Sequence, residues 1–229
     1  GQAVIKYSNE LIKQFIKKEV PSISDRDLEE CIIYNDTDSS YVTITPLIEQ
    51  GVKFLDGEDI HKETLDKIQE IEDYLNQGVS EWAKKALLTK DSRFIFKREC
   101  IADVGVFLQK KRYVMHILDD EGIKENKFKY TGVEVVRTTM PNAIKPYAKK
   151  IIETMLTTQS LGKTNELLNE TYEIFKGLGP QELAFVMGVK GYEKYATQCN
   201  QFTTTKGMPI HVKSAYFYNM LLDKLNTGN

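Results

Sequence analysis

The sequence lacks several features that would place it in a specialised class. No stretch of its 229 residues approaches the run of about 20 apolar residues that a membrane-spanning helix needs. No basic segment followed by an apolar one opens the chain, so we predict that it is not exported. There is no internal repeat and no low-complexity segment. Apolar residues at 41% and charged residues at 28% predict a globular protein with one large domain or two small ones.

Cysteine is also scarce. The three cysteines are an odd number, lie far apart and form no Cys-x-x-Cys pair (Cys31, Cys100 and Cys199). This pattern argues against a disulfide framework and against a zinc site, and it favours a reducing compartment.

No charge of either sign dominates, since the net charge is −2. The distribution is nevertheless uneven. Acidic residues outnumber basic ones between positions 49 and 91, and the reverse holds between positions 106 and 150. A local basic segment weakly indicates a polyanionic partner, and solvated helix faces explain it equally well.

Hydrophobic spacing predicts a mixed fold. A helix is expected over residues 3–19 and another over residues 58–88, the second broken at Gly78. Between them, Cys31–Tyr34 and Tyr41–Ile44 predict two strands of a hairpin, joined by turn-forming residues 35–40. Further strands are predicted at Phe94–Phe96, Val104–Leu108, Tyr113–Leu118 and Tyr130–Val136.

The pattern becomes mainly helical after Pro141. Two helices are predicted around residues 144–155 and 167–175, separated by Leu161-Gly162, and a last one at His211–Leu225. The expected fold class is therefore α+β, with an antiparallel sheet and flanking helices followed by a mainly α-helical part.

The hairpin carries the main chemical signal, Tyr34-x-Asp36-Thr37-Asp38-Ser39. A lone Asp-x-Asp in a turn is usually structural, because Asp bonds its own backbone. Here strand alternation is expected to put Asp36 and Asp38 on the same side. Two adjacent carboxylates repel each other unless a cation neutralises them, and hard oxygen ligands of this kind suit Mg²⁺.

This motif resembles motif C of family B DNA polymerases of the T-even bacteriophage type. Further segments resemble the same family in its order and cover nearly the whole chain: Gly1–Ala3, Lys97–Ile101, Lys110–Tyr113, Lys129–Glu134, Thr138–Pro141, Pro209–Lys213 and Tyr218-Asn219. The resemblance implies a palm portion over residues 1–140 and a thumb portion over residues 141–229.

The resemblance also implies a function and its residues. The expected activity is DNA-directed DNA polymerisation, with template-dependent nucleotidyl transfer by two metal ions. Asp36, Asp38 and Glu99 are the catalytic candidates, and Asp38 and Asp36 are the candidates for binding Mg²⁺. Lys111 and Tyr113 are expected to share a strand face at the 3′ end of the primer. The full set of DNA-binding candidates is Lys110, Lys111, Arg112, Tyr113, Lys129, Arg137, His211 and Lys213.

Parts of the family pattern are missing. The sequence has no motif A aspartate, no motif B lysine and tyrosine, and no exonuclease carboxylates, and the thumb portion ends early. We therefore expect a split subunit or fragment, inactive alone, that an upstream polypeptide carrying motifs A and B completes. Its other expected partners are primer–template DNA and deoxynucleoside triphosphates, with no membrane, in the cytoplasm of a virus-infected bacterial cell. The exposed face of the first helix is expected to be a partner interface.

Two alternatives stay open. The first is a non-catalytic primer–template DNA-binding module or inactive polymerase remnant, against which the intact Asp36 and Asp38 argue. The second is an unrelated nucleotidyltransferase with an Asp-Thr-Asp hairpin, which would leave the Lys-Lys-Arg-Tyr segment at 110–113 unexplained.

Overall fold

The structure is a computed structural model that describes residues 2–88, 90, 93–196 and 206–227. Gly1 and Cys199 therefore lie outside the described residues. The elements are α1 (Gln2–Glu19), α2 (Asp25–Glu30), β1 (Ile32–Asp36), β2 (Ser39–Val42), α3 (Thr45–Glu49), β3 (Leu55–Asp56), β4 (Asp59–Ile60), α4 (Lys62–Ala86), β5 (Cys100–Gln109), β6 (Arg112–Asp120), β7 (Ile123–Thr131), the 3₁₀ helix η1 (Glu134–Val136), α5 (Lys145–Thr158), α6 (Leu161–Lys176), α7 (Pro180–Leu183), α8 (Tyr192–Ala196) and α9 (Ile210–Thr227).

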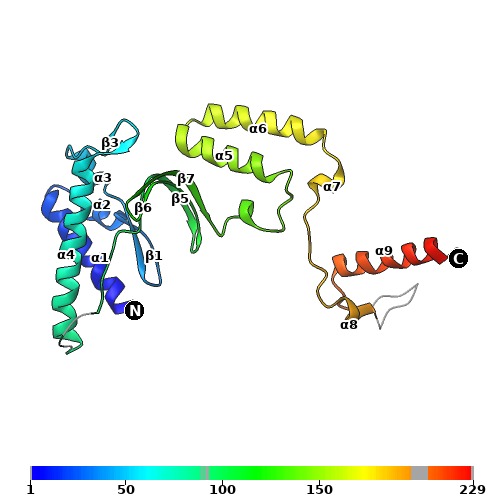
Figure 1. Cartoon of the computed structure of the whole chain (residues 1–229), viewed down its shortest axis with the longest axis horizontal. Coiled ribbons are helices and arrows are strands. Elements are labelled where there is room, and N and C mark those ends of the chain that lie inside the picture. The colour runs from blue at the N-terminus through cyan, green and yellow to red at the C-terminus, as the bar shows by residue number, and fades with distance from the viewer. Residues whose placement is uncertain (1, 89, 91–92, 197–205, 228–229) are drawn as a thin grey trace.

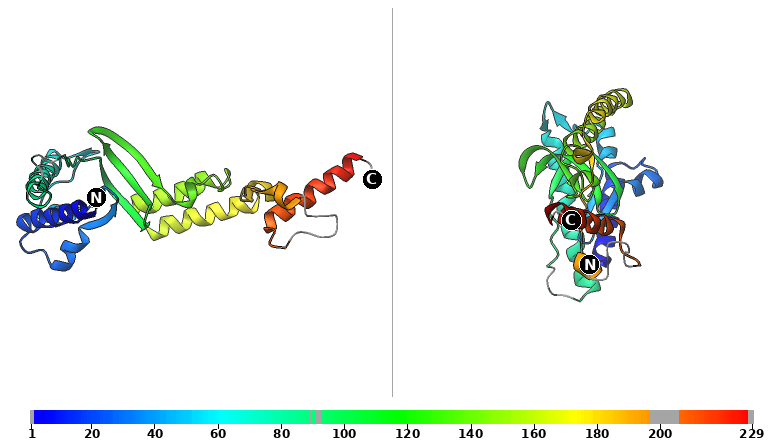
Figure 2. Two further views of the ribbon diagram at one scale, coloured as in Figure 1. Left: turned by 90° about the horizontal axis from the view of Figure 1, so that it is seen from below. Right: turned by 90° about the vertical axis from the view of Figure 1, so that its right-hand side faces the viewer.

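These elements follow one another along an elongated molecule (Figure 1). Helices α1 to α4 and the β1–β2 hairpin form one end, the sheet β5–β6–β7 comes next, and the α5–α6 pair follows. Figure 2 shows α7 to α9 lying beyond that pair, at the other end from the hairpin. The predicted fold class is confirmed, since a three-stranded antiparallel sheet has flanking helices and a helical part follows it.

The N-terminal core is built on α1 and α4. The apolar face of α1 is buried in a core cluster that also contains Leu75 and Val79 of α4. Helix α4 runs through Gly78 without a break, so the predicted interruption is wrong. A Cβ at Gly78 would lie 2.6 Å from Leu11 Cδ1, which shows that glycine lets the two helices pack closely.

The outward face of α1 is polar. Its exposed residues include Lys6, Glu10, Gln14 and Lys18, whereas Ile16 is fully buried. This chain therefore covers the apolar side of α1 itself. A partner interface on the exposed face of α1 would therefore be polar, and it stays a prediction.

The three-stranded sheet is covered on both faces. Strand β6 is central, pairing antiparallel with β5 and with β7. Its Val114 points into a cluster with Val135 of η1 and Leu156 of α5, whereas Tyr113 and Met115 point to the opposite face. Because successive side chains of a strand point to opposite sides, β6 joins the helical layer to the hairpin layer.

Three predicted strand boundaries are wrong. Residues 94–96 form no strand, because the side chain of Asn76 on α4 pairs with both the N–H and the C=O of Phe96 at 2.8 Å. Strand β7 ends at Thr131, since Gly132 has φ +60° and η1 follows. In the hairpin the turn is confined to Thr37 and Asp38, so the strands extend into the region predicted as turn.

The break between α5 and α6 also differs from the prediction. It falls at Gln159, which has the left-handed φ of 47°, and at Ser160, whose hydroxyl caps α6 by accepting from the Lys163 N–H. Leu161-Gly162 therefore forms the first turn of α6 rather than a linker. Among the helices of the described residues, none has the length and apolar character needed to cross a membrane.

Candidate functional site

The hairpin places its two aspartates differently from the prediction. Asp36 ends β1 and faces Ser39 in the register, whereas Asp38 lies in the two-residue turn after Thr37. Thr37 has φ 49°, and the Asp38 N–H donates to the Asp36 carbonyl. The chain thus reverses between the two aspartates, so strand alternation does not apply and the predicted shared strand face is wrong.

The two carboxylates have different surroundings. Asp36 is half-buried, and its Oδ1 accepts from the Thr37 hydroxyl at 3.2 Å and lies 3.6 Å from Lys111 Nζ. Asp38 is exposed, and its carboxylate has neither a hydrogen bond nor an ion pair with any residue that the structure describes. Asp36 therefore already has a counter-ion, and Asp38 does not.

Asp38 lines a cavity of about 940 Å³ beside the hairpin. Three further acidic residues line it, and each has a partner: Glu72 accepts from the Arg98 N–H at 2.8 Å, Asp103 lies 2.8 Å from His116 Nδ1, and Glu99 accepts from Lys129 Nζ at 3.1 Å. Within the described part of the chain, Asp38 is the acidic residue of this cavity that remains available to an added cation.

The same cavity is lined by two strands of different sheets. Residues 39–42 of β2 and residues 100–105 of β5 both line it. Strand β2 pairs with β1, and β5 pairs with β6, while within the described residues no ladder joins β2 to β5. Among the described residues, β2 and β5 thus each have one edge without a ladder, and both strands line the same cavity. An unpaired strand edge can accept an additional strand.

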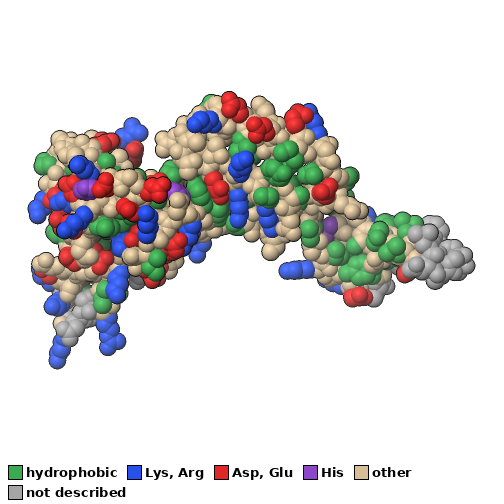
Figure 3. Space-filling model, turned by 45° about the horizontal axis from the view of Figure 1, so that its top comes forward, with side chains coloured by type: hydrophobic (Ala, Val, Ile, Leu, Met, Phe, Trp, Pro, Cys, Tyr) green, Lys and Arg blue, Asp and Glu red, His purple; other side chains and the backbone are tan. Residues whose placement is uncertain are grey.

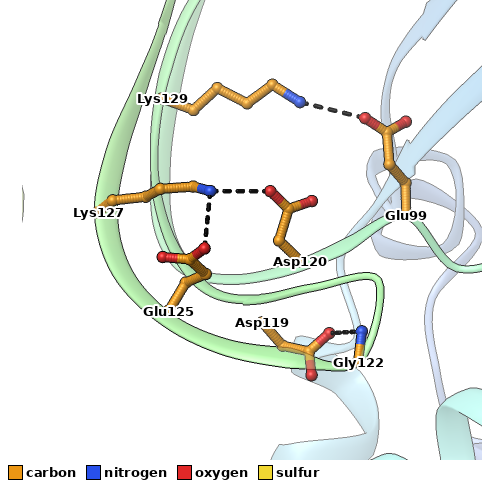
Figure 4. Close-up of polar contacts among 7 residues, drawn as sticks. All are labelled: Glu99, Asp119, Asp120, Gly122, Glu125, Lys127 and Lys129. Atoms are coloured by element: carbon orange, nitrogen blue, oxygen red, sulfur yellow. Dashed lines mark hydrogen bonds and ion pairs between the residues drawn. The ribbon is translucent and has the colours of Figure 1, made fainter.

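Glu99 lies next to the carboxyl end of β6 and the start of β7. Figure 4 shows Lys129 reaching across to Glu99, while Lys127 lies between Asp120 and Glu125. Burial is the largest single influence on the pKa of Lys129 and lowers it. The hydrogen bond to Glu99 and the nearby negative charge of Glu99 together raise it by more, so the pKa is raised overall. One predicted catalytic residue thus neutralises one predicted DNA-binding residue in this structure.

The basic segment 110–113 is a turn followed by a strand start. Lys110 and Lys111 connect β5 to β6, and Lys111 has φ 60°. The predicted strand face shared by Lys111 and Tyr113 is therefore wrong. The Lys111 N–H donates to the Tyr34 hydroxyl at 2.8 Å, so the β1–β2 hairpin holds this turn at both the backbone and the side chain of Lys111.

Tyr113 belongs to an aromatic cluster beneath the hairpin. Its ring packs against the rings of Tyr34, Tyr41 and Phe107, at centroid distances of 5.2–6.2 Å. Tyr113 is 6% exposed, and its hydroxyl shares a hydrogen bond of 2.8 Å with that of Tyr41. Burial, followed by this hydrogen bond, raises the pKa of Tyr41. The pairing escaped prediction because nothing local in the sequence tells which strands meet.

The remaining predicted DNA-binding residues fall into two groups. Arg112 and Arg137 both approach Glu134, near the end of β7. His211 and Lys213 lie on α9, which Figures 1 and 2 both show at the far end of the molecule from the hairpin. The structure thus brings most candidates to one end of the sheet and leaves the two on α9 apart.

Comparison with known proteins then bears on this arrangement. The chain matches no protein-family profile. It is 24% identical to the DNA-directed DNA polymerase of Escherichia phage RB69 in an alignment of 237 positions, which covers 96% of this chain. The predicted similarity to a phage DNA polymerase is confirmed. The chain spans 25% of the length of that relative.

A polymerase-like chain raises the question of a divalent cation. Among the described residues there is no cluster of three or more His, Cys, Asp or Glu side chains that could hold a metal ion. The chemistry of the donors nevertheless fits Mg²⁺, because Asp38 offers an uncompensated carboxylate beside the hydroxyls of Thr37 and Ser39 at the cavity. The hairpin can thus contribute part of a magnesium site.

Proposed function

We propose that this chain is the palm and thumb part of a family B DNA polymerase, with the palm over residues 1–140 and the thumb over residues 141–229. It would take part in template-dependent nucleotidyl transfer to a DNA primer, using deoxynucleoside triphosphates, in the cytoplasm of an infected bacterial cell. The observation that carries the proposal is the unpartnered Asp38 at the cavity of a chain similar to a phage polymerase.

In this proposal Asp38 is the carboxylate of this chain that binds Mg²⁺. A pair of such ions, when bound, would stabilise the attacking and leaving oxygens of an in-line displacement. Asp36 contributes negative charge beside Asp38 while it orients Lys111, which lies 3.6 Å away. Glu99 lines the same cavity and would act there once Lys129 engages DNA.

The proposal includes an upstream polypeptide that carries motifs A and B. The sequence contains neither motif, and Asp38 alone cannot complete a two-metal site. The cavity lined by β2 and β5 supports the proposal, because a strand of the partner could pair there and bring its aspartate beside Asp38.

The test is reconstitution with a polypeptide carrying motifs A and B, followed by single-turnover incorporation on a primed template. We expect no extension by this chain alone and Mg²⁺-dependent extension by the pair. Asp38→Asn should reduce the rate at least a hundredfold, because the amide keeps the size of the side chain but removes the charge that holds the metal. That loss corresponds to about 3 kcal/mol at about 1.4 kcal/mol per tenfold.

Two further variants make the test specific. Lys111→Ala should cost less than Asp38→Asn, since it removes primer positioning and leaves the metal ligand in place. Asp56→Asn is the matched control, because Asp56 is an exposed aspartate of the other hairpin, β3–β4. Near-normal incorporation by Asp38→Asn would show that the hairpin aspartate is only a turn former.

A further inference from the structure

Two arginines at the end of the sheet share one carboxylate. Arg112, the first residue of β6, places Nη1 3.8 Å from Glu134 Oε1, and Arg137 places its Nη1 3.1 Å from the same oxygen. All three side chains are partly exposed, with Glu134 at 56%. A carboxylate held between two guanidinium groups occupies the position in which a phosphate would be bound by the same pair.

The same arrangement recurs among the other predicted DNA-binding cations of the sheet. Lys111 pairs with Asp36, and Lys129 pairs with Glu99. Lys110 is the exception, having no carboxylate partner among the residues that the structure describes. On the face of the N-terminal half that Figure 3 shows, acidic and basic side chains are interspersed. Most of the positive charge of these predicted DNA-binding residues is thus balanced by carboxylates of the same chain.

The carboxylate of Glu134 is not needed to hold the local backbone. The Glu134 carbonyl, not its side chain, accepts from the Arg137 N–H at 3.0 Å. The segment is fixed against the basic turn at Gly132, where an added Cβ would lie 2.1 Å from the Lys111 carbonyl oxygen. Removing the charge of Glu134 should therefore release the two arginines without displacing them.

We propose that Glu134 limits the affinity of this surface for DNA, because it competes with DNA phosphate for Arg112 and Arg137. Exposed ion pairs of this kind are weak, so phosphate can displace the carboxylate. Every DNA-binding event must nevertheless break these ion pairs, which lowers the affinity. The result is a low intrinsic affinity for nucleic acid that contacts elsewhere must supplement. The choice of DNA as the competing anion rests on the proposed function, whereas the competition itself rests on the ion-pair geometry.

The experiment compares the wild-type chain with Glu134→Gln by fluorescence anisotropy on a labelled primer–template duplex. At low salt we expect Glu134→Gln to bind about fivefold more tightly, as expected for one unit charge removed about 4 Å from its partners in a solvent-like dielectric. Its plot of log K against log salt should be steeper, by about 0.9 for each additional phosphate neutralised. Glu134→Asp keeps the charge and should stay within about twofold of wild type.

Glu173→Gln is the matched control. Glu173 forms an exposed i,i+3 pair with Lys176 on α6, just as Glu134 does with Arg137, and the substitution changes the net charge equally. It should change the affinity less than twofold. Unchanged or weaker binding by Glu134→Gln would overturn the proposal and would mean that the carboxylate orients the arginines instead.

A second probe separates this inference from the proposed function. Inorganic polyphosphate presents the same anion without bases or a primer end. If neither protein binds the duplex but Glu134→Gln binds polyphosphate more tightly than wild type, the polymerase proposal fails and the competition stands. Equal binding of polyphosphate by both proteins would refute the competition.

Discussion

The hydroxyl pair of Tyr41 and Tyr113 should behave as a coupled unit, because each hydroxyl is the other's partner. The two oxygens are 2.8 Å apart, Tyr113 is buried at 6% exposure, and the rings lie within an aromatic cluster. A change of either tyrosine to phenylalanine keeps the ring packing and removes one oxygen. It also leaves the remaining hydroxyl in an apolar site without its partner.

The expected losses of stability differ between removing one hydroxyl and removing both. An unsatisfied buried hydroxyl costs about 1–3 kcal/mol, whereas replacing both members of a pair by apolar groups can be nearly neutral. Because Tyr41 is only partly buried, we expect Tyr113→Phe and Tyr41→Phe to lose about 1–2 kcal/mol each. The double variant should lose less than the sum of the two, which gives a coupling energy of about 1 kcal/mol.

The assay is urea denaturation of the wild type, both single variants and the double variant, followed by circular dichroism. The m-value should stay constant while the midpoint shifts, because the surface exposed on unfolding is nearly unchanged. Tyr218→Phe serves as the control, since Tyr218 is 62% exposed, and it should shift stability by less than about 0.5 kcal/mol. If the double variant loses as much stability as the two single variants added together, the hydrogen bond between the two hydroxyls is refuted.

Three further predictions concern stability. Gly132→Ala should lose at least about 2 kcal/mol in the same assay, because a φ of +60° and the contact with the Lys111 carbonyl both disfavour a side chain. Ile16→Ala should lose about 2–5 kcal/mol by opening a cavity in the α1–α4 core, where Ile16 has no exposed surface; wild-type stability would contradict the core. Burial raises the pKa of Cys31 and of Tyr41 above their usual 9.0 and 10.0. The neutral forms of these two side chains therefore contribute fully to the free energy of unfolding below those pH values, and the contribution is lost as the pH rises from the usual pKa through the raised one. Urea midpoints measured from neutral to alkaline pH should therefore fall above about pH 9, and less steeply in Cys31→Ser.

The sequence alone was sufficient for the features that depend on neighbours along the chain. Helical spacing located α1 and most of α4, and turn-forming residues located the hairpin. The ordered motifs indicated a similarity to a phage DNA polymerase, which 24% identity over 96% of the chain confirms. These features can be recognised from the sequence because a helix period, a turn or a motif is complete within a few residues.

Tertiary structure decided which side chains meet. The bond from the Lys111 N–H to the Tyr34 hydroxyl spans 77 positions, and the bond between Tyr41 and Tyr113 spans 72. It also decided that Gly78 packs two helices together rather than breaking one, because that role depends on Leu11, far away in the sequence. The hairpin turn places Asp36 beside Lys111 and Asp38 at the cavity. Side chains alternate between the two faces only within a strand, and the two-residue turn interrupts that pattern between the aspartates.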